Sequence, residues 1–173
     1  ARSWFFMCFS FFWLEIFPKI GSTIILVINE MRVRDQNGGK PLRGTYRRFI
    51  KNELIVVRGN CESEVDQTVL EFPILAEYSY LLLGEKTVFT THGHKYSPKN
   101  LPPLKDRDIF LYGHTHIPQG EIYQGKFIIN PGSISLPKGG YNPTYGILTD
   151  TSWKILEVEG NKEILLLDFF DIY

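Results

Sequence analysis

The four histidines of this 173-residue chain are the side chains whose type and spacing best suit chemistry. They form two His-x-His pairs, His92 with His94 and His114 with His116. Random placement of four histidines would give only about 0.1 such pairs, so composition does not explain the pattern. In an extended segment, residues i and i+2 point to the same side, about 6.5–7 Å apart. Each pair can therefore present two imidazoles to one cation or to two neighbouring cations.

The histidines favour a metal site with mixed nitrogen and oxygen donors. Neutral imidazole is the commonest metal-binding side chain, and together with amide and carboxylate oxygens it suits Mn, Fe, Zn or Ni. Gly93 and Gly113 stand beside the histidines, which lets backbone or substrate approach closely. A structural interpretation, in which each ring is hydrogen-bonded to backbone or water, stays open. We favour metal binding because both pairs follow short β-branched runs.

Runs of β-branched and apolar residues that end in turn residues predict the strands that carry these side chains. The predicted strands are Leu54–Val57, Thr87–Thr91, Asp108–Tyr112, Lys126–Ile129, Tyr145–Leu148, Trp153–Val158 and Glu163–Phe169. Residues Glu62–Leu70 are predicted to form a short helix, and Arg32–Arg48 a loop. Buried strands followed by polar loops favour a layered α/β domain, in which sites form beyond the strand ends. Four such ends would bring Asn60, the two histidine pairs and Asn130 to one place.

Composition predicts one soluble globular domain over residues 1–173, with 43% hydrophobic and 22% charged residues. The 19 basic and 19 acidic side chains cancel, which disfavours nucleic acid as a partner. Cys8 and Cys61 are far apart in the chain, so we expect a reducing, cytoplasmic location rather than a disulfide framework. The apolar run Ser3–Leu14 is shorter than the roughly 20 residues that span a membrane, so no membrane association is expected. Homo-oligomerisation is left open.

Three short motifs resemble the last three metal motifs of the calcineurin-like metallophosphoesterases: Gly59-Asn60, Thr91–His94 and Gly113–His116. Longer strings narrow the resemblance to the bacterial YfcE-type phosphodiesterases: VRGNCESEVDQ at 57–67, FTTHGHKYSPKNLP at 89–102, LYGHTHIP at 111–118 and NPGSISLPKGG at 130–140. The resemblance covers residues 51–150, with the C-terminal strands plausible and residues 1–50 outside it.

This resemblance implies a four-layer αββα sandwich and hydrolysis of a small phosphodiester by a metal-activated water at a two-metal centre. It implies manganese as the usual metal. Asn60, His92 and His114 would hold one cation and His116 the other, and His92 and His114 would thereby be catalytic. Many members of the family have a histidine, often cast as a general acid, where Cys61 stands here. Cys61 is therefore a catalytic candidate, although a small buried filler is an equally open interpretation.

The N-terminal motifs of the family, Asp-x-His and Gly-Asp, are missing. Residues 1–50 contain one aspartate, Asp35, and no histidine. Without a bridging carboxylate to offset the repulsion between two cations, a second cation should bind poorly. We therefore expect the N-terminal β-α-β portion to be degraded or missing. The alternative function is an inactive or single-metal relative that binds a metal or a partner. A shifted reading frame upstream of Ile50 would explain the missing motifs, and the coding DNA decides this.

Other features leave two interpretations each. The Asn130–Ser133 turn could present N–H groups to a phosphate, although a plain turn is slightly favoured. Arg58 could pair with a phosphate or be a solvated residue at a strand end. A nuclease-like activity is disfavoured by the zero net charge. The sequence has no Gly-x-Ser-x-Gly turn, Walker loop or zinc-ribbon cysteine array, which argues against those classes of protein.

Overall fold

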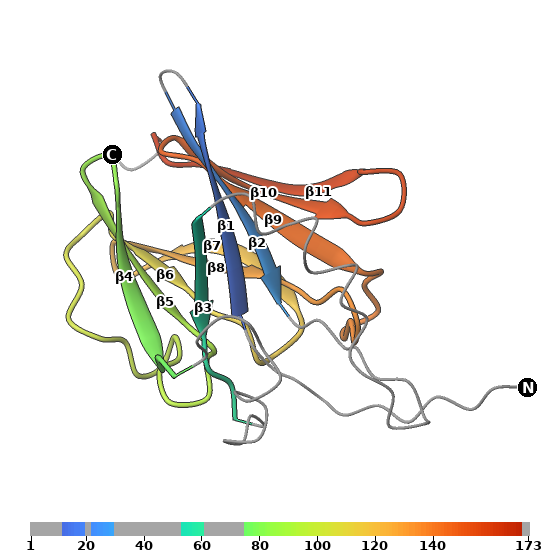
Figure 1. Ribbon diagram of the computed structural model, residues 1–173, viewed down its shortest axis with the longest axis horizontal. Helices are drawn as coiled ribbons and strands as arrows, with labels where there is room; N and C mark the ends of the chain where they lie inside the picture. Colours follow the sequence, from blue (N-terminus) through green and yellow to red (C-terminus); the bar gives the residue numbers. More distant parts are fainter. Residues whose placement is uncertain (1–11, 20–21, 30–52, 61–74, 171–173) are drawn as a thin grey trace, which may run out of the picture.

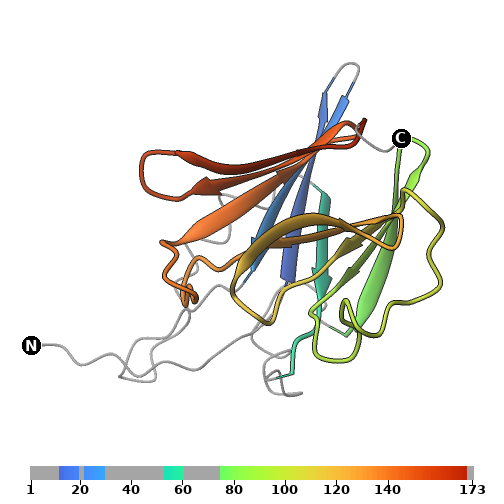
Figure 2. The same cartoon turned by 180° about the vertical axis from the view of Figure 1, so that it is seen from behind.

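Two β-sheets make up the described part of the protein (Figures 1 and 2). A computed structural model describes residues 12–19, 22–29, 53–60 and 75–170. Sheet A has the order β11-β10-β9-β2-β1-β3 and sheet B the order β4-β5-β6-β8-β7. The strands are β1 Phe12–Lys19, β2 Ser22–Asn29, β3 Glu53–Val57, β4 Tyr78–Leu83, β5 Lys86–Thr91, β6 Ile109–Leu111, β7 Pro118–Tyr123, β8 Lys126–Pro131, β9 Thr144–Leu148, β10 Ser152–Glu157 and β11 Glu163–Asp168.

The seven strands predicted from the sequence are confirmed, with ends that differ by one or two residues. The prediction omits β1, β2, β4 and β7. Of these, β4 and β7 are the edge strands of sheet B, and β7 (PQGEIY) is too polar to show an apolar period. The predicted helix at Glu62–Leu70 and the predicted loop at Arg32–Arg48 lie outside the described residues. Within the described ranges there is no helix, and hence none long and apolar enough to cross a membrane.

The core lies between the two sheets. Side chains of the strands of sheet B alternate, so that Val88, Ile109, Leu111, Phe127 and Ile129 face sheet A. They pack against Val57, Leu148, Trp153 and Ile155, all fully buried. The intervening residues Phe89, Phe110 and Ile128 point to the outer face of sheet B, where the segment after β5 covers them with Tyr96, Leu101 and Leu104. The described strands thus supply the two β-layers of the expected sandwich.

The N-terminal portion is present as an antiparallel hairpin rather than as a β-α-β unit. Strands β1 and β2 pair from Phe12 with Asn29 to Lys19 with Ser22, and they lie inside sheet A between the edge strand β3 and β9 (Figure 1). Parallel strands need a crossover of a dozen or more residues, whereas antiparallel neighbours need only a tight connection. Because only two residues separate β1 from β2, the antiparallel arrangement is the one the chain can reach.

Strands β5, β6 and β8 are parallel neighbours in the middle of sheet B. Their carboxyl ends therefore meet at one edge of the sheet, next to the end of β3. The backbone N–H of Gly113 donates to the carbonyl of His92 at 2.9 Å, which extends the β5–β6 alignment beyond the strands. This edge is where the sequence places Asn60, His92, His114 and Asn130.

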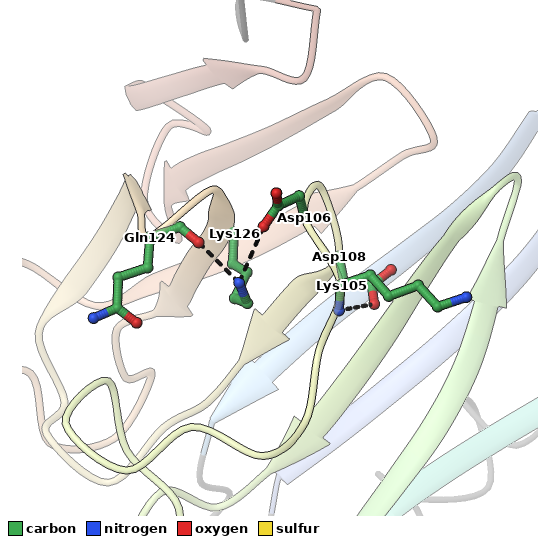
Figure 3. Close-up of polar contacts among 5 residues, drawn as sticks. All are labelled: Lys105, Asp106, Asp108, Gln124 and Lys126. Carbon is green, nitrogen blue, oxygen red and sulfur yellow. Dashed lines mark hydrogen bonds and ion pairs between the residues drawn. The ribbon is translucent and has the colours of Figure 1, made fainter.

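The opposite edge of sheet B is held by a polar cluster (Figure 3). The buried carboxylate of Asp108 accepts the backbone N–H groups of Thr87 at 2.8 Å and Lys105 at 2.9 Å. The ammonium group of Lys126 lies 3.3 Å from the carboxylate of Asp106. These contacts fix the starts of β5, β6 and β8 relative to one another.

Candidate metal centre

Asn60, His92 and His114 converge at the carboxyl edge of sheet B. The Nε2 atom of His92 lies 3.0 Å from Oδ1 of Asn60 and 3.1 Å from Nδ1 of His114. The three residues come from three separate segments, after β3, β5 and β6. The sequence predicted that these strand ends would meet, and the coordinates bring these three side chains together.

The same atoms form an incomplete hydrogen-bond network. A neutral imidazole has one nitrogen that donates a hydrogen bond and one that accepts. The Nδ1 of His92 is buried and has no hydrogen-bond partner in the described part of the chain. If Nε2 carries the proton, Nδ1 is an unpaired acceptor. If Nδ1 carries it, the lone pair of Nε2 faces the carbonyl oxygen of Asn60. In the second case, a cation between Nε2 of His92 and Oδ1 of Asn60 would replace the contact between two acceptors.

The spacing of the donors fits a divalent cation. Two donors on adjacent corners of an octahedron, about 2.1 Å from a cation, lie about 3.0 Å apart. The two distances from His92 Nε2 have this size. Among the described residues, however, no three His, Cys, Asp or Glu side chains group closely enough to hold a metal. The donor set therefore depends on the amide of Asn60, and the described residues add no carboxylate to it.

Burial keeps His92 in the form that binds cations. The ring is fully buried, and this desolvation lowers the pKa of His92 to about 3, with the charges of His114, His94 and His116 acting in the same direction. At neutral pH the ring is therefore uncharged, and a nitrogen lone pair is available to a metal.

The segment that carries the second histidine pair has an unusual backbone. His114 and His116 have φ values of 64° and 63°, in the left-handed region that non-glycine residues rarely occupy. His116 is buried, and its Nδ1 lies 2.8 Å from the carbonyl of Leu136. A carbonyl can only accept, so Nδ1 carries the proton and Nε2 holds the lone pair in the neutral ring. Backbone carbonyls commonly orient metal-binding histidines in this way.

Gly93 allows the two histidine segments to lie side by side. Its φ is 111°, and a Cβ at this position would lie 3.1 Å from the carbonyl oxygen of Gly113 and 3.2 Å from Cβ of His114. A side chain here would push the segment after β6 away from His92. The sequence predicted that Gly93 lets backbone or substrate approach closely, and in the structure it is the backbone at Gly113 and His114 that lies against Gly93.

Asn130 ties the end of β8 to the histidine segment. Its Nδ2 donates to the carbonyl of Gly113 at 3.1 Å and to Oγ1 of Thr115 at 3.0 Å. Its Oδ1 accepts the backbone N–H of Gly132 at 2.9 Å. The Gly132 N–H is thus used within the turn, which favours the plain-turn interpretation of Asn130–Ser133.

A cavity of about 370 Å³ opens beside the donors. The described residues that line it are Arg58, Gly59, Asn60, Glu77, His94 and Lys95. The ring centroid of His94 lies 5.4 Å from that of His92 and 6.5 Å from that of His114. Sequence reasoning missed Glu77 and Lys95, because single charged residues in loops carry no periodic or motif signal. Cys61 lies outside the described residues.

Comparisons with known proteins agree with the motifs. The profile of the calcineurin-like phosphoesterase superfamily domain matches residues 40–152. Phosphodiesterase YfcE of Escherichia coli K12 is 40% identical over 141 residues, which cover 78% of this chain and 77% of that protein. The probable metallophosphoesterase YsnB of Bacillus subtilis is 33% identical over 101 residues, which cover 54% of this chain and 55% of that protein.

A solved structure of YfcE, described as a phosphoesterase from E. coli, is similar to this chain with a TM-score of 0.63 and 43% sequence identity. The match covers 65% of this chain and 62% of the solved chain, so it spans less than two thirds of that protein. The family resemblance predicted from the motifs is confirmed, as is the fold it implies. The family model matches residues 40–152, so the match begins eleven residues before the approximate start at residue 51 that the motifs indicated.

Proposed function

Because the chain belongs to the calcineurin-like phosphoesterase superfamily, we propose that it is a metal-dependent phosphodiesterase that hydrolyses small phosphodiesters. The observation that carries this proposal is the convergence of Asn60 and His114 on the buried, uncharged ring of His92. The relative that is 40% identical is named a phosphodiesterase, which supports the diester as substrate. The zero net charge supports a small substrate rather than nucleic acid.

Asn60, His92 and His114 would hold one divalent cation, and His116 would contribute to a second. A bound cation there supplies Lewis acidity, which activates water and offsets negative charge on the phosphate oxygens. Imidazole nitrogen with amide oxygen is a donor set that Mn²⁺ accepts, so we propose manganese. Within the protein, burial keeps His92 neutral, and the carbonyl of Leu136 holds His116 in one tautomer.

Proton donation to the leaving group has one candidate from the sequence. Cys61 directly follows Asn60 in the chain and stands where many members of the family have a histidine that is often cast as a general acid. Its role as a catalytic residue stays a prediction.

A second candidate function is a single-metal relative that binds a cation without turnover. The absence of a carboxylate-containing cluster among the described residues favours it, as does the lack of the family's N-terminal motifs in residues 1–50. Metal content of the purified protein separates the candidates. Two cations per chain support the two-metal enzyme, whereas one cation per chain without hydrolysis supports the single-metal relative.

Hydrolysis of bis(p-nitrophenyl) phosphate with added Mn²⁺ tests the proposed activity. We expect His114→Ala and Asn60→Ala to lower kcat/KM more than about 100-fold, because each removes a cation donor. Asn142→Ala is the matched control: this exposed amide donates to the carboxylate of Glu157 at 3.0 Å on the surface. Hydrolysis that survives both donor variants would overturn the assignment of the site.

We further propose that residues 1–173 form a single phosphoesterase domain that acts in the cytoplasm. The two widely separated cysteines support a reducing compartment. Size-exclusion chromatography with light scattering decides whether the domain is a monomer or a homo-oligomer.

A further inference from the structure

The cavity beside the candidate metal centre has a charged lining that the cation does not use. Asn60 belongs both to the cavity and to the donor set. The described lining also contains two basic side chains, Arg58 and Lys95, and one acidic side chain, Glu77. These described residues thus give the cavity an excess of positive charge at neutral pH. None of the three belongs to the donor set, so their charges act on what enters the cavity.

Backbone contacts bring the three charged residues together. The N–H of Arg58, just after β3, donates to the carbonyl of Ala76 at 2.7 Å, which places Arg58 beside the residue that precedes Glu77. Lys95 lies three residues after His92 in the chain. Its ammonium group forms an ion pair with the carboxylate of Glu77. The cavity therefore lies where the edge strands β3 and β4 of the two sheets approach each other.

The electrostatics of Glu77 support this grouping. The hydrogen bond from Lys95 is the largest cause that lowers the pKa of Glu77, and the charges of Lys95, His94 and Arg58 lower it further. Desolvation acts in the opposite direction. Lys95 and Arg58 thus both favour the negative charge of the Glu77 carboxylate, and another anion entering the cavity would meet the same two basic side chains.

The ion pair between Lys95 and Glu77 is one that a ligand can replace. The two side chains are 52% and 47% exposed, so water screens their attraction. An ammonium group has three donor hydrogens, and a phosphate offers strong acceptors to them. A phosphate in the cavity would therefore take the place of Glu77 as the partner of Lys95. The volume of about 370 Å³ is within the range of small-molecule sites.

We propose that this cavity is a subsite for a second phosphate on the substrate, carried by the half of the phosphodiester that lies beside Asn60. Lys95 and Arg58 recognise that phosphate, and Glu77 holds Lys95 at the cavity when it is empty. This subsite rests on the proposed function and narrows its substrate class to diesters that bear a further phosphate.

Two chromogenic substrates test the subsite. One is the p-nitrophenyl ester of thymidine 5′-phosphate, and the other is the same ester with a 3′-phosphate. The readout, measured with Mn²⁺, is the kcat/KM for the ester that bears the 3′-phosphate divided by the kcat/KM for the ester without it. We expect a ratio above one that falls about five- to twentyfold in Lys95→Met, rises in Glu77→Gln and shrinks with added salt. Lys99→Met, an exposed lysine outside the described lining, should keep the wild-type ratio.

A ratio that is the same in Lys95→Met and the wild type, or that falls equally in Lys99→Met, would overturn the subsite. Calorimetric binding of thymidine 5′-phosphate and thymidine 3′,5′-bisphosphate by the Mn²⁺-treated protein gives a second readout, independent of turnover. If neither ester is hydrolysed but the bisphosphate binds more tightly through Lys95, the proposed function fails and the subsite stands. If hydrolysis occurs and Lys95→Met binds both nucleotides as the wild type does, the subsite fails alone.

Discussion

Replacing Asn130 with alanine tests whether one buried amide holds the histidine segment in place for metal binding. The side chain of Asn130 is fully buried. It donates two hydrogen bonds, to the carbonyl of Gly113 and to Thr115, and accepts one from the N–H of Gly132, at distances of 2.9–3.1 Å. All three hydrogen bonds are lost in Asn130→Ala, and none can be remade by a methyl group.

The expected effect follows from the backbone that these bonds support. His114 and His116 both have φ near +64°, a conformation that costs roughly 1–3 kcal/mol per non-glycine residue, or roughly 2–6 kcal/mol for the two. Three hydrogen bonds contribute about 1.5–4.5 kcal/mol in total. The three hydrogen bonds of Asn130 thus contribute about as much as the left-handed backbone costs. Without them, the backbone of His114 and His116 should leave the left-handed conformation. We expect the free energy of unfolding to fall by about 2–4 kcal/mol and Mn²⁺ affinity to fall about 10- to 100-fold.

Urea denaturation measures the free energy of unfolding, and calorimetric titration with Mn²⁺ measures the affinity under conditions where the variant is folded. The exposed amide of Asn142 supplies the control, and Asn142→Ala should change stability by less than about 0.5 kcal/mol and leave Mn²⁺ affinity unchanged. If Asn130→Ala is destabilised but binds Mn²⁺ as tightly as the wild type, Asn130 is only a core residue and its positioning role is refuted.

Three further perturbations have expected outcomes. In Gly146→Ala the new Cβ would lie 1.9 Å from Cη2 of the buried Trp153, so denaturation should show a loss of about 1–3 kcal/mol or more. Asp108→Ala removes the acceptor of two backbone N–H groups at the far edge of sheet B; we expect a loss of about 1–3 kcal/mol with unchanged Mn²⁺ affinity, and a weakened affinity would contradict the separation of the two edges (Figure 3). The pKa of His92 is about 3 in the fold and 6.5 in the unfolded chain, so between these values the unfolded state binds more protons. The metal-free protein should lose up to about 1.4 kcal/mol of stability per pH unit as pH falls below 6.5, and a stability independent of pH from 6.5 to 4 would contradict the burial of His92.

Several features of the site could be predicted from the sequence because they depend on local patterns. Runs such as Leu54–Val57 and Lys126–Ile129 are short, apolar and bounded by turn residues, which is the signature of buried strands. Two His-x-His pairs after such runs were enough to indicate a donor cluster. Since the carboxyl ends of parallel neighbours meet at one sheet edge, the order of residues along the chain predicted that His92 and His114 would meet. Asn60 follows β3 of the other sheet, so its place beside His92 depends on how the two sheets pack.

The pairing of the N-terminal strands was not predictable in the same way. The resemblance implies a β-α-β unit at the N-terminus, and the missing motifs predicted that this unit is degraded or missing. The described residues agree, because β1 and β2 form an antiparallel hairpin inside sheet A in its place. An aromatic or β-branched run indicates that a segment is a strand, but its neighbour is chosen by the packing of the whole sheet. Likewise β7 (PQGEIY), at an edge of sheet B, carries too weak an apolar period to be predicted, whereas β4 (YSYLLL) is aromatic and apolar and was missed.

The sequence alone determined which residues can donate to a cation and which family the chain belongs to, because residue type and short-range spacing are written directly in it. Only the tertiary structure decided the left-handed backbone of His114 and His116, the buried amide of Asn130 that holds it, and the meeting of Glu77 with Lys95. The last two features join residues that are 15 to 18 positions apart in the chain. Their contacts exist only after the strands of sheet B have paired, so no local pattern encodes them.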